Sequence, residues 1–237
     1  MSGVGENLLG GEDPFDTVMD GASLIGELFA AANPEKAGPM AAYMRDQFPF
    51  LGIPSSARKP IQRPFFAVAR KDPHADWAFV AQCWALPQRE FQYVACDYLY
   101  AVRKRLGADD LPRIKSLASA KQWWDSIDAL QKPVGAIAAD SAPAREQMIE
   151  WSVDDDFWIR RLAITHQLGR KGATDTDLLK SILVANLGSE EFFINKAIGW
   201  ALRDFSKTNP QWVAAFVAEY GSQMASLSLR EGSKYLP

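Results

Sequence analysis

Apolar residues recur at helical spacing through almost all of the chain, and this periodicity constrains the fold more than any other feature of the sequence. One long stripe runs through Phe91, Val94, Ala95, Tyr98, Leu99, Val102 and Leu106. Positions three, four and seven residues apart share one face of an α-helix, so the stripe predicts an amphipathic helix. No segment alternates apolar and polar residues long enough to predict a strand. The chain is therefore predicted to be all-α.

The predicted helices come in pairs, with a shorter helix followed after a few residues by a longer one. The pairs begin at Asp76, Leu111, Ala142, Thr174 and Pro210. Successive starts lie 31 to 36 residues apart, which is the period of helical-hairpin repeats such as HEAT repeats. Hairpins of this kind stack into an α-α superhelix, a solenoid with a concave face. We expect no sheet and at least five stacked hairpins.

Two segments depart from the regular pattern. Residues 1–13 contain four glycines and are predicted to form a flexible tail, which leaves residues 14–237 as a single repeat domain. In residues 56–71, Pro60 and Pro64 interrupt a helical pattern. Because proline lacks a backbone N–H and its ring crowds the preceding turn, this helix is expected to be kinked or shortened.

Cysteine and histidine are too scarce for a disulfide framework or a zinc site. The chain holds Cys83, Cys96, His74 and His166, and both thiols lie in apolar helical patterns, where we expect them buried and reduced. The sequence does not start with a basic segment followed by a long apolar run, and no stretch approaches a membrane span. We expect a cytoplasmic protein that does not associate with membranes.

The distribution of charge matters more than its total. The chain carries 26 basic and 29 acidic residues, a formal net charge of −3. Residues 1–44 hold seven of the acids and one base, so residues 45–237 hold 25 bases and 22 acids. Binding to phosphate depends on a local basic face rather than on the net charge. The charge alone neither establishes nor excludes a nucleic-acid partner.

Trp124 and Asp128 lie four residues apart in a predicted helix, so their side chains project from the same face. Trp123, Ile127 and Leu130 fall on the neighbouring face, which suits packing in the core. The spacing thus places one indole beside a carboxylate and leaves the other for packing. The alternative is that both indoles belong to the core and that Asp128 is an ordinary surface acid.

Several short segments between residues 35 and 235 carry a family resemblance. They are MAAYM (40–44), FLGI (50–53), LPQREFQ (86–92), WWDSID (123–128), WIRRLAI (158–164), EFFINKAIGWALR (191–203) and KTNP (207–210). Taken together and in this order, they resemble the AlkD-like DNA alkylation repair glycosylases. The acidic N-terminal tail lies outside the resemblance.

The resemblance implies both a fold and an activity. It implies a superhelix of HEAT-like repeats, a monomer whose concave face grips double-stranded DNA at the bacterial nucleoid. It further implies hydrolysis of the N-glycosidic bond of N3- or N7-alkylated purines, with no metal and no cofactor. In this family the lesion need not be flipped into a pocket, unlike the usual strategy of glycosylases.

The chemistry gives Asp128 and Trp124 catalytic roles under this resemblance. An alkylated purine is cationic and leaves readily, and its departure produces an oxocarbenium-like sugar. A fixed carboxylate stabilises that cation and orients or deprotonates the attacking water. The face of an indole adds an electron-rich contact to the sugar and the cationic base. No activated lysine is needed, so a hydrolytic glycosylase is expected rather than a lyase.

Further site residues are implied by the matching motifs. Arg161, rather than its neighbour Arg160, matches the arginine of the catalytic site and is expected to hold a backbone phosphate by forked hydrogen bonds. Trp200 matches an aromatic residue of the same site. Weaker candidates for lining the site or contacting phosphate are Tyr43, Phe192, Lys196, Arg203 and Lys207. His166 is expected to be a hydrogen-bonded helix residue rather than a catalytic base.

Two other interpretations remain open from the sequence. The first is a catalytically inactive HEAT-repeat scaffold that binds DNA or a protein through its concave face, since a fold does not fix a function. The second is a protein-binding solenoid unrelated to DNA, which the net acidity favours. Retention of Trp124, Asp128 and Arg161 favours the enzyme, because a scaffold has no chemical need for this set.

Overall fold

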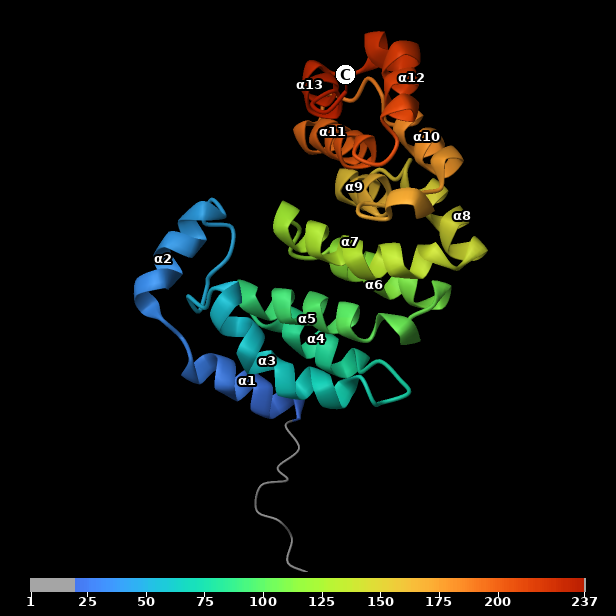
Figure 1. Cartoon of the computed structure of the whole chain (residues 1–237). Coiled ribbons are helices and arrows are strands. Elements are labelled where there is room, and N and C mark those ends of the chain that lie inside the picture. The colour runs from blue at the N-terminus through green and yellow to red at the C-terminus, as the bar shows by residue number, and fades with distance from the viewer. Residues whose placement is uncertain (1–19, 237) are drawn as a thin grey trace, which may run out of the picture.

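The computed structural model describes residues 20–236, and within that range the protein consists of α-helices and short 3-10 turns with no β-strand (Figure 1). The α-helices are α1 (Gly21–Ala30), α2 (Pro34–Tyr43), α3 (Ser55–Ala69), α4 (Trp77–Ala85), α5 (Arg89–Ala101), α6 (Leu111–Ala118), α7 (Trp124–Ala139), α8 (Ala142–Trp151), α9 (Phe157–Thr165), α10 (Thr176–Val184), α11 (Phe192–Ser206), α12 (Pro210–Tyr220) and α13 (Ser226–Gly232). The predicted all-α fold is confirmed.

From α4 onward the helices follow one another as hairpins, and successive hairpins pack against each other. Within hairpins, α4 packs on α5, α6 on α7 and α8 on α9. The longer helices form a row in which α5 contacts α7, α7 contacts α9 and α9 contacts α11. Figure 1 shows the resulting curved stack, which rises from the blue N-terminal helices to the red C-terminal ones. This arrangement is the predicted superhelix.

The predicted starts of the hairpins agree closely with the structure. Asp76 is the N-cap of α4, and Leu111, Ala142 and Pro210 are the first residues of α6, α8 and α12. Thr174 lies just before α10. Except at α6, the N-cap residue of each of these helices is short and polar, and its side chain accepts a hydrogen bond from a backbone N–H of the first turn that would otherwise lack a partner. The carboxylate of Asp76, for example, accepts from the N–H of Phe79.

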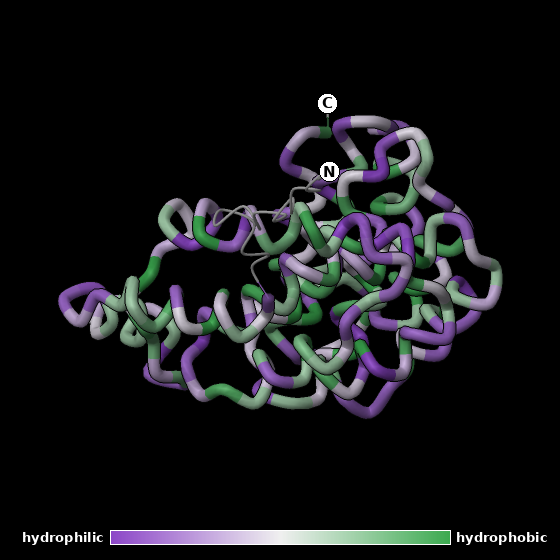
Figure 2. Tube along the Cα trace, turned by 90° about the horizontal axis from the view of Figure 1, so that it is seen from below, coloured by the Kyte–Doolittle hydropathy of each residue, from purple (hydrophilic) through white to green (hydrophobic). Residues whose placement is uncertain are grey.

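One apolar core runs through the stack. It extends without a break from Leu24 in α1 to Met224, just before α13. Hydrophobic segments fill the middle of the stack in Figure 2, while hydrophilic segments gather at its edges. A continuous core is expected of a solenoid, because each hairpin buries apolar faces against both of its neighbours.

Helix α3 differs from its sequence-based expectation. Pro60 and Pro64 lie inside it, and the helix is neither broken nor shortened at either residue. Both prolines are exposed and, being four residues apart, lie on one face. The carbonyl groups that lose a helical partner therefore face solvent, where water can donate to them. The expected shortening was wrong for this reason.

Helix α2 stands beside the stack and buries none of its residues. The segment that follows it is fixed by Glu90 of α5, whose carboxylate accepts hydrogen bonds from the backbone N–H groups of Leu51, Gly52 and Ile53 at 2.9 to 3.0 Å. Gly52 has φ +85°, and a Cβ there would lie 2.0 Å from the carbonyl oxygen of Asn33. Only glycine fits, so the segment that follows α2 packs directly against the N-cap residue of α2.

Some predictions concern residues outside the described range. The tail predicted for residues 1–13 lies outside it, as do residues 14–19 and 237 of the predicted domain. Within residues 20–236, no helix combines the length and the apolar character that crossing a membrane requires.

The contact between α7 and α9 gives a prediction about stability. A Cβ at Gly135 would lie 2.2 Å from the backbone oxygen of His166. Gly135→Ala should therefore push α7 from α9 and lower the free energy of unfolding by about 1–3 kcal/mol, the usual cost of overpacking. Urea denaturation measures the change.

Gly26→Ala is the matched control, because nothing lies within 4 Å of a Cβ at that exposed position of α1. It should raise the free energy of unfolding by up to about 1 kcal/mol, the difference in helix propensity. If Gly135→Ala proved as stable as Gly26→Ala, the close approach of α7 to α9 would be contradicted.

Candidate active site

The first turns of α7 present two different faces, as the spacing of their residues predicts. Trp123, immediately before the helix, packs against Trp158 and Phe193, with ring centroids 6.1 and 5.7 Å away. Ile127 is fully buried. Trp124 and Asp128 project from the other face and are each only partly buried. One indole is thus used for packing, while the other lies on the same exposed side as the carboxylate.

Asp128 forms a two-point ion pair with Arg161 of α9. The Nε and Nη2 groups of Arg161 donate to the two carboxylate oxygens at 2.9 and 3.0 Å. The Nη1 group of Arg161 donates to the backbone oxygen of Phe193 in α11 at 2.7 Å. The side chain of Arg161 is 4% exposed and that of Asp128 is 19% exposed. The pair therefore links α7, α9 and α11 and fixes the plane of the carboxylate.

Three influences act on the protonation of Asp128. Burial raises the pKa of its carboxyl group above the ordinary value, and this effect is the largest. The hydrogen bonds and charge of Arg161 lower the pKa, while the charge of Asp125 raises it. The resultant pKa is raised, so Arg161 offsets only part of the cost of burying this charge.

Aromatic side chains of α2, α7 and α11 contact either Arg161 or one another near the ion pair. The ring of Tyr43, at the end of α2, meets Trp124 edge-on with centroids 6.1 Å apart. The guanidinium carbon of Arg161 lies 5.9 Å from the ring centroids of both Trp200 and Phe193 in α11. Tyr43 is 72% exposed. Trp200 thus lies against the guanidinium of the ion pair. Tyr43 lies against Trp124, which precedes Asp128 by one turn of α7.

Arg161 uses most of its hydrogen-bond donors within the protein. Three of its five N–H groups are taken by Asp128 and by the carbonyl of Phe193. These contacts fix the carboxylate of Asp128, and the expected contact of Arg161 with phosphate stays a prediction. The neighbouring Arg160 points elsewhere and donates to the backbone oxygen of Asp154 at 3.0 Å.

Lys196 and Arg203 lie on one face of α11, as their spacing predicts, but both are engaged by an acid. Glu231 of α13 accepts from Lys196 at 2.9 Å and from Arg203 at 2.5 Å. If Lys196 and Arg203 contact phosphate as expected, the phosphate must compete with the carboxylate of Glu231 for them. Lys207 is exposed, with its amine 3.9 Å from Asp204. Phe192 is 57% exposed and packs edge-on against Phe193.

The other titratable candidates lie outside the site. Burial lowers the pKa of His166 to about 4, and its Nδ1 lies 2.6 Å from the backbone oxygen of Ala163. Burial raises the pKa of the Cys83 thiol to about 12, and Cys96 is buried as well. His166 is thus a neutral core residue and both thiols are unreactive. Among residues 20–236, no group of three or more His, Cys, Asp or Glu side chains is arranged to hold a metal ion.

Sequence reasoning missed two residues that shape the site. Phe193 contributes its backbone oxygen to Arg161 and its ring to Trp123, yet nothing in a run of two phenylalanines distinguishes it from Phe192. Glu231 pairs with two candidate cations from 28 and 35 residues away. No local pattern signals a contact over that distance.

Sequence comparison assigns the chain to a family. The sequence profile of the family described as DNA alkylation repair enzyme matches residues 24–236. The chain belongs to the DNA alkylation repair enzyme family. No curated protein matches it significantly.

A solved structure, described as a predicted DNA alkylation repair enzyme from Enterococcus faecalis, is similar to the chain. The TM-score is 0.80 and the sequence identity is 37%, over 86% of this chain and 96% of that one. The family's superhelical fold thus covers nearly all of the described range. The site residues from Tyr43 to Trp200 all lie within the residues that the family profile matches.

The ion pair of this repair enzyme gives a prediction about pKa. Arg161 lowers the pKa of Asp128 against the effect of burial, so Arg161→Gln should raise that pKa further. Carboxyl carbon NMR of the protein without DNA measures the change across a pH titration. Lys180→Gln, which removes an exposed ion pair with Glu219, should leave the pKa of Asp128 where it is. An unchanged or lower pKa in Arg161→Gln would contradict the assignment.

Proposed function

We propose that the protein is a monofunctional DNA glycosylase that hydrolyses the N-glycosidic bond of cationic N3- or N7-alkylated purines in double-stranded DNA. The observation that carries the proposal is the Asp128 carboxylate, which Arg161 holds at two points. The ring of Trp200 lies 5.9 Å from the guanidinium carbon of Arg161, and the ring of Tyr43 meets that of Trp124 one turn before Asp128. A fixed negative charge beside electron-rich rings is suited to a reaction that develops positive charge.

The alkylated base makes the first step accessible without an acid. Alkylation at N3 or N7 gives the purine a positive charge, so it leaves as a neutral base when the bond from C1′ to nitrogen breaks and the electron pair goes to nitrogen. The sugar is left with oxocarbenium character. Asp128 stabilises that cation electrostatically, because its orientation is set before the reaction.

Water completes the reaction. Its oxygen forms the new bond to C1′, and Asp128 orients the water or accepts its proton. Asp128 must be ionised for either role, although burial raises its pKa. Arg161 favours the ionised form and aims the carboxylate. The cation beside Asp128 is a guanidinium, which cannot form the Schiff base of a lyase, so hydrolysis is the expected outcome.

The aromatic side chains support recognition at the surface. Tyr43 and Phe192 are more than half exposed, and Trp124 and Trp200 are partly exposed. Their rings can contact the deoxyribose and the cationic base from outside the duplex. In this proposal the lesion is therefore recognised without extrusion into an enclosed pocket.

Basic side chains of α11 support contact with the DNA backbone. Lys196 and Arg203 together carry two positive charges against the single negative charge of Glu231. Lys207 follows at the end of the same helix with an exposed amine. Asp204 lies 3.9 Å from that amine. These basic side chains lie along the helix that also carries Trp200, which suits contact with phosphates next to the lesion.

Asp128→Asn tests the proposal, because it keeps the size of the side chain and removes its charge. Base release in a single turnover should slow by roughly 100-fold or more, equivalent to about 3 kcal/mol of lost transition-state stabilisation. Affinity for the duplex should stay similar or tighten, because a repulsion with phosphate is removed. Release of 7-methylguanine from a defined duplex gives the rate, and a binding titration gives the affinity.

Asp177→Asn is the control, since Asp177 is an exposed acid on α10 and its loss should leave the rate unchanged. Thermal melting of each variant is needed as well, because Asp128→Asn leaves the buried Arg161 without its counter-charge. Equal rates for the wild type and a folded Asp128→Asn variant would leave a DNA-binding solenoid with no assigned chemistry.

A further inference from the structure

The start of α7 lacks an ordinary helix cap. Its N-cap residue is Trp123, whose side chain accepts no hydrogen bond from the first turn. Lys121, two residues earlier, has φ +52°, a conformation that is costly for a residue with a side chain. This poorly capped turn carries Trp124 and leads directly to Asp128. Something other than the turn itself must hold it in place.

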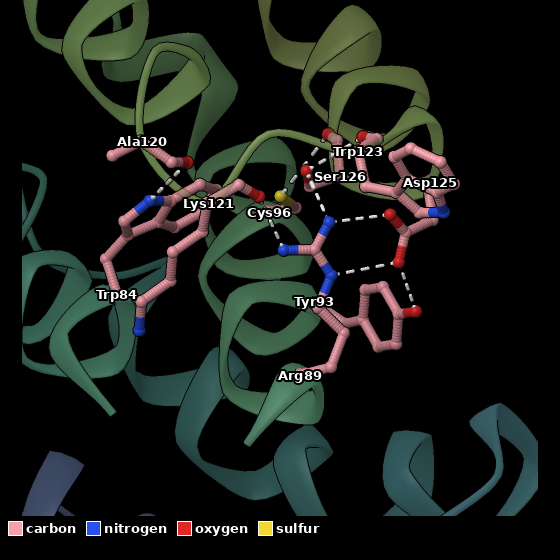
Figure 3. A network of polar contacts seen from close by, with 9 residues as sticks. All are labelled: Trp84, Arg89, Tyr93, Cys96, Ala120, Lys121, Trp123, Asp125 and Ser126. Atoms are coloured by element: carbon pink, nitrogen blue, oxygen red, sulfur yellow. Dashed lines mark hydrogen bonds and ion pairs between the residues drawn. The ribbon is translucent and has the colours of Figure 1, made fainter. Parts of the chain in front are cut away.

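Arg89 of α5 holds this segment through other contacts (Figure 3). Its side chain is 0% exposed. Its Nη1 group donates to the backbone oxygen of Lys121 at 2.8 Å, and its Nη2 group donates to the hydroxyl oxygen of Ser126 at 2.8 Å. Nε and Nη2 also donate to the two carboxylate oxygens of Asp125, at 2.9 and 2.6 Å. One guanidinium thus fixes the segment from residue 121 to residue 126.

Tyr93, one turn further along α5, completes this network. Its hydroxyl donates to the carboxylate of Asp125 at 2.5 Å. Burial raises the pKa of Tyr93, and the charge of Asp125 raises it further, so the hydroxyl stays protonated and keeps donating. The ring of Phe48 stacks on the guanidinium of Arg89, 3.9 Å from its carbon atom. The side-chain partners of Asp125 therefore come from α5 and are rigidly placed.

The network and the candidate active site share one helical turn. Asp125 and Asp128 are three residues apart on α7, and Trp124 precedes Asp125 directly. A rotation or shift of this turn would move Trp124 and Asp128 together. Arg161 holds Asp128 from α9, while Arg89 holds the same turn from α5. The carboxylate of Asp128 is therefore positioned through contacts with both neighbouring helices.

We propose that Arg89, acting through Asp125 and aided by the Tyr93 hydroxyl, is a positioning residue that sets the orientation of Trp124 and Asp128 for base release. The inference rests on the proposed function. Arginine is required because lysine offers a single cationic nitrogen and cannot reach the acceptors of residues 121, 125 and 126 at once. Tyr93 makes a smaller contribution through one hydrogen bond.

The test compares Arg89→Lys and Tyr93→Phe with the wild type. Arg89→Lys should slow single-turnover base release by about 10- to 100-fold, the scale of loss for a misplaced catalytic group, while affinity for undamaged duplex changes less than about twofold. As the two-point contact between Asp128 and Arg161 loosens, the acid limb of the rate profile should move to higher pH. Tyr93→Phe should act in the same direction with a smaller effect and little loss of stability.

Asn186→Ala is the control for a loss of stability alone. Asn186 is buried just after α10 and donates to the backbone oxygens of Ser152 and Ile182, so its loss should lower the melting temperature without changing the rate of the folded enzyme. All rates are compared at a temperature where each variant is folded. The proposal would be overturned if Arg89→Lys and Tyr93→Phe both kept the wild-type rate and the wild-type pH profile. It would also be overturned if the rate of base release fell no further in these variants than in Asn186→Ala.

A second measurement separates this inference from the proposed function. The pKa of Asp128, followed by carboxyl carbon NMR without DNA, should rise in Arg89→Lys. If it rises while the wild-type protein releases no base, the positioning role stands and the proposed function fails. If wild-type protein releases base and the pKa and the rate are unmoved in both variants, the positioning role fails and the proposed function stands.

Discussion

A carboxylate that is largely buried needs a partner of opposite charge, and the ion pair between Asp128 and Arg161 meets that need at the centre of the molecule. Removing either partner would leave an uncompensated charge among aromatic rings, which is far more costly than losing a surface pair. The same arrangement recurs along the row of longer helices. Arg58 of α3 reaches Asp97 of α5, and Arg89 of α5 reaches Asp125 of α7. Each of these interfaces is therefore fixed by a polar contact as well as by apolar packing.

The repeat architecture explains how residues distant in sequence reach one place. Each hairpin contributes one helix to the row of longer helices, so the residues of the site come from successive helices of that row. Helix α7 provides Trp124 and Asp128, α9 provides Arg161 and α11 provides Trp200. Tyr43 is the last residue of α2, a helix none of whose residues is buried. The segment after α2 is held by hydrogen bonds to the carboxylate of Glu90. A rigid stack with a separately anchored helix thus assembles an aromatic surface around one carboxylate.

Local spacing allowed much of this to be predicted. Helical periodicity indicated the fold class and the starts of the hairpins, and the spacing of Trp124 and Asp128 placed them on one face. Local spacing could not predict the pairs between residues distant in the sequence. The guanidinium of Arg161 pairs with the carboxylate of Asp128, 33 residues away, and Lys196 pairs with Glu231, 35 residues away. Partners at such distances are chosen by the stacking of hairpins, which leaves no periodic signal. The continuity of α3 through Pro60 depends on the exposure of that face, and this too is a property of the stack.

The central claim is that the ion pair serves the release of cationic purines from DNA, and the identity of the released bases tests it most directly. Duplex DNA treated with a methylating agent would be incubated with the wild-type protein in the presence of a chelator, and the free bases identified by mass spectrometry. We expect 7-methylguanine and 3-methyladenine to appear faster than by spontaneous loss, while unmodified bases stay in the DNA. Release at the spontaneous rate alone would contradict it.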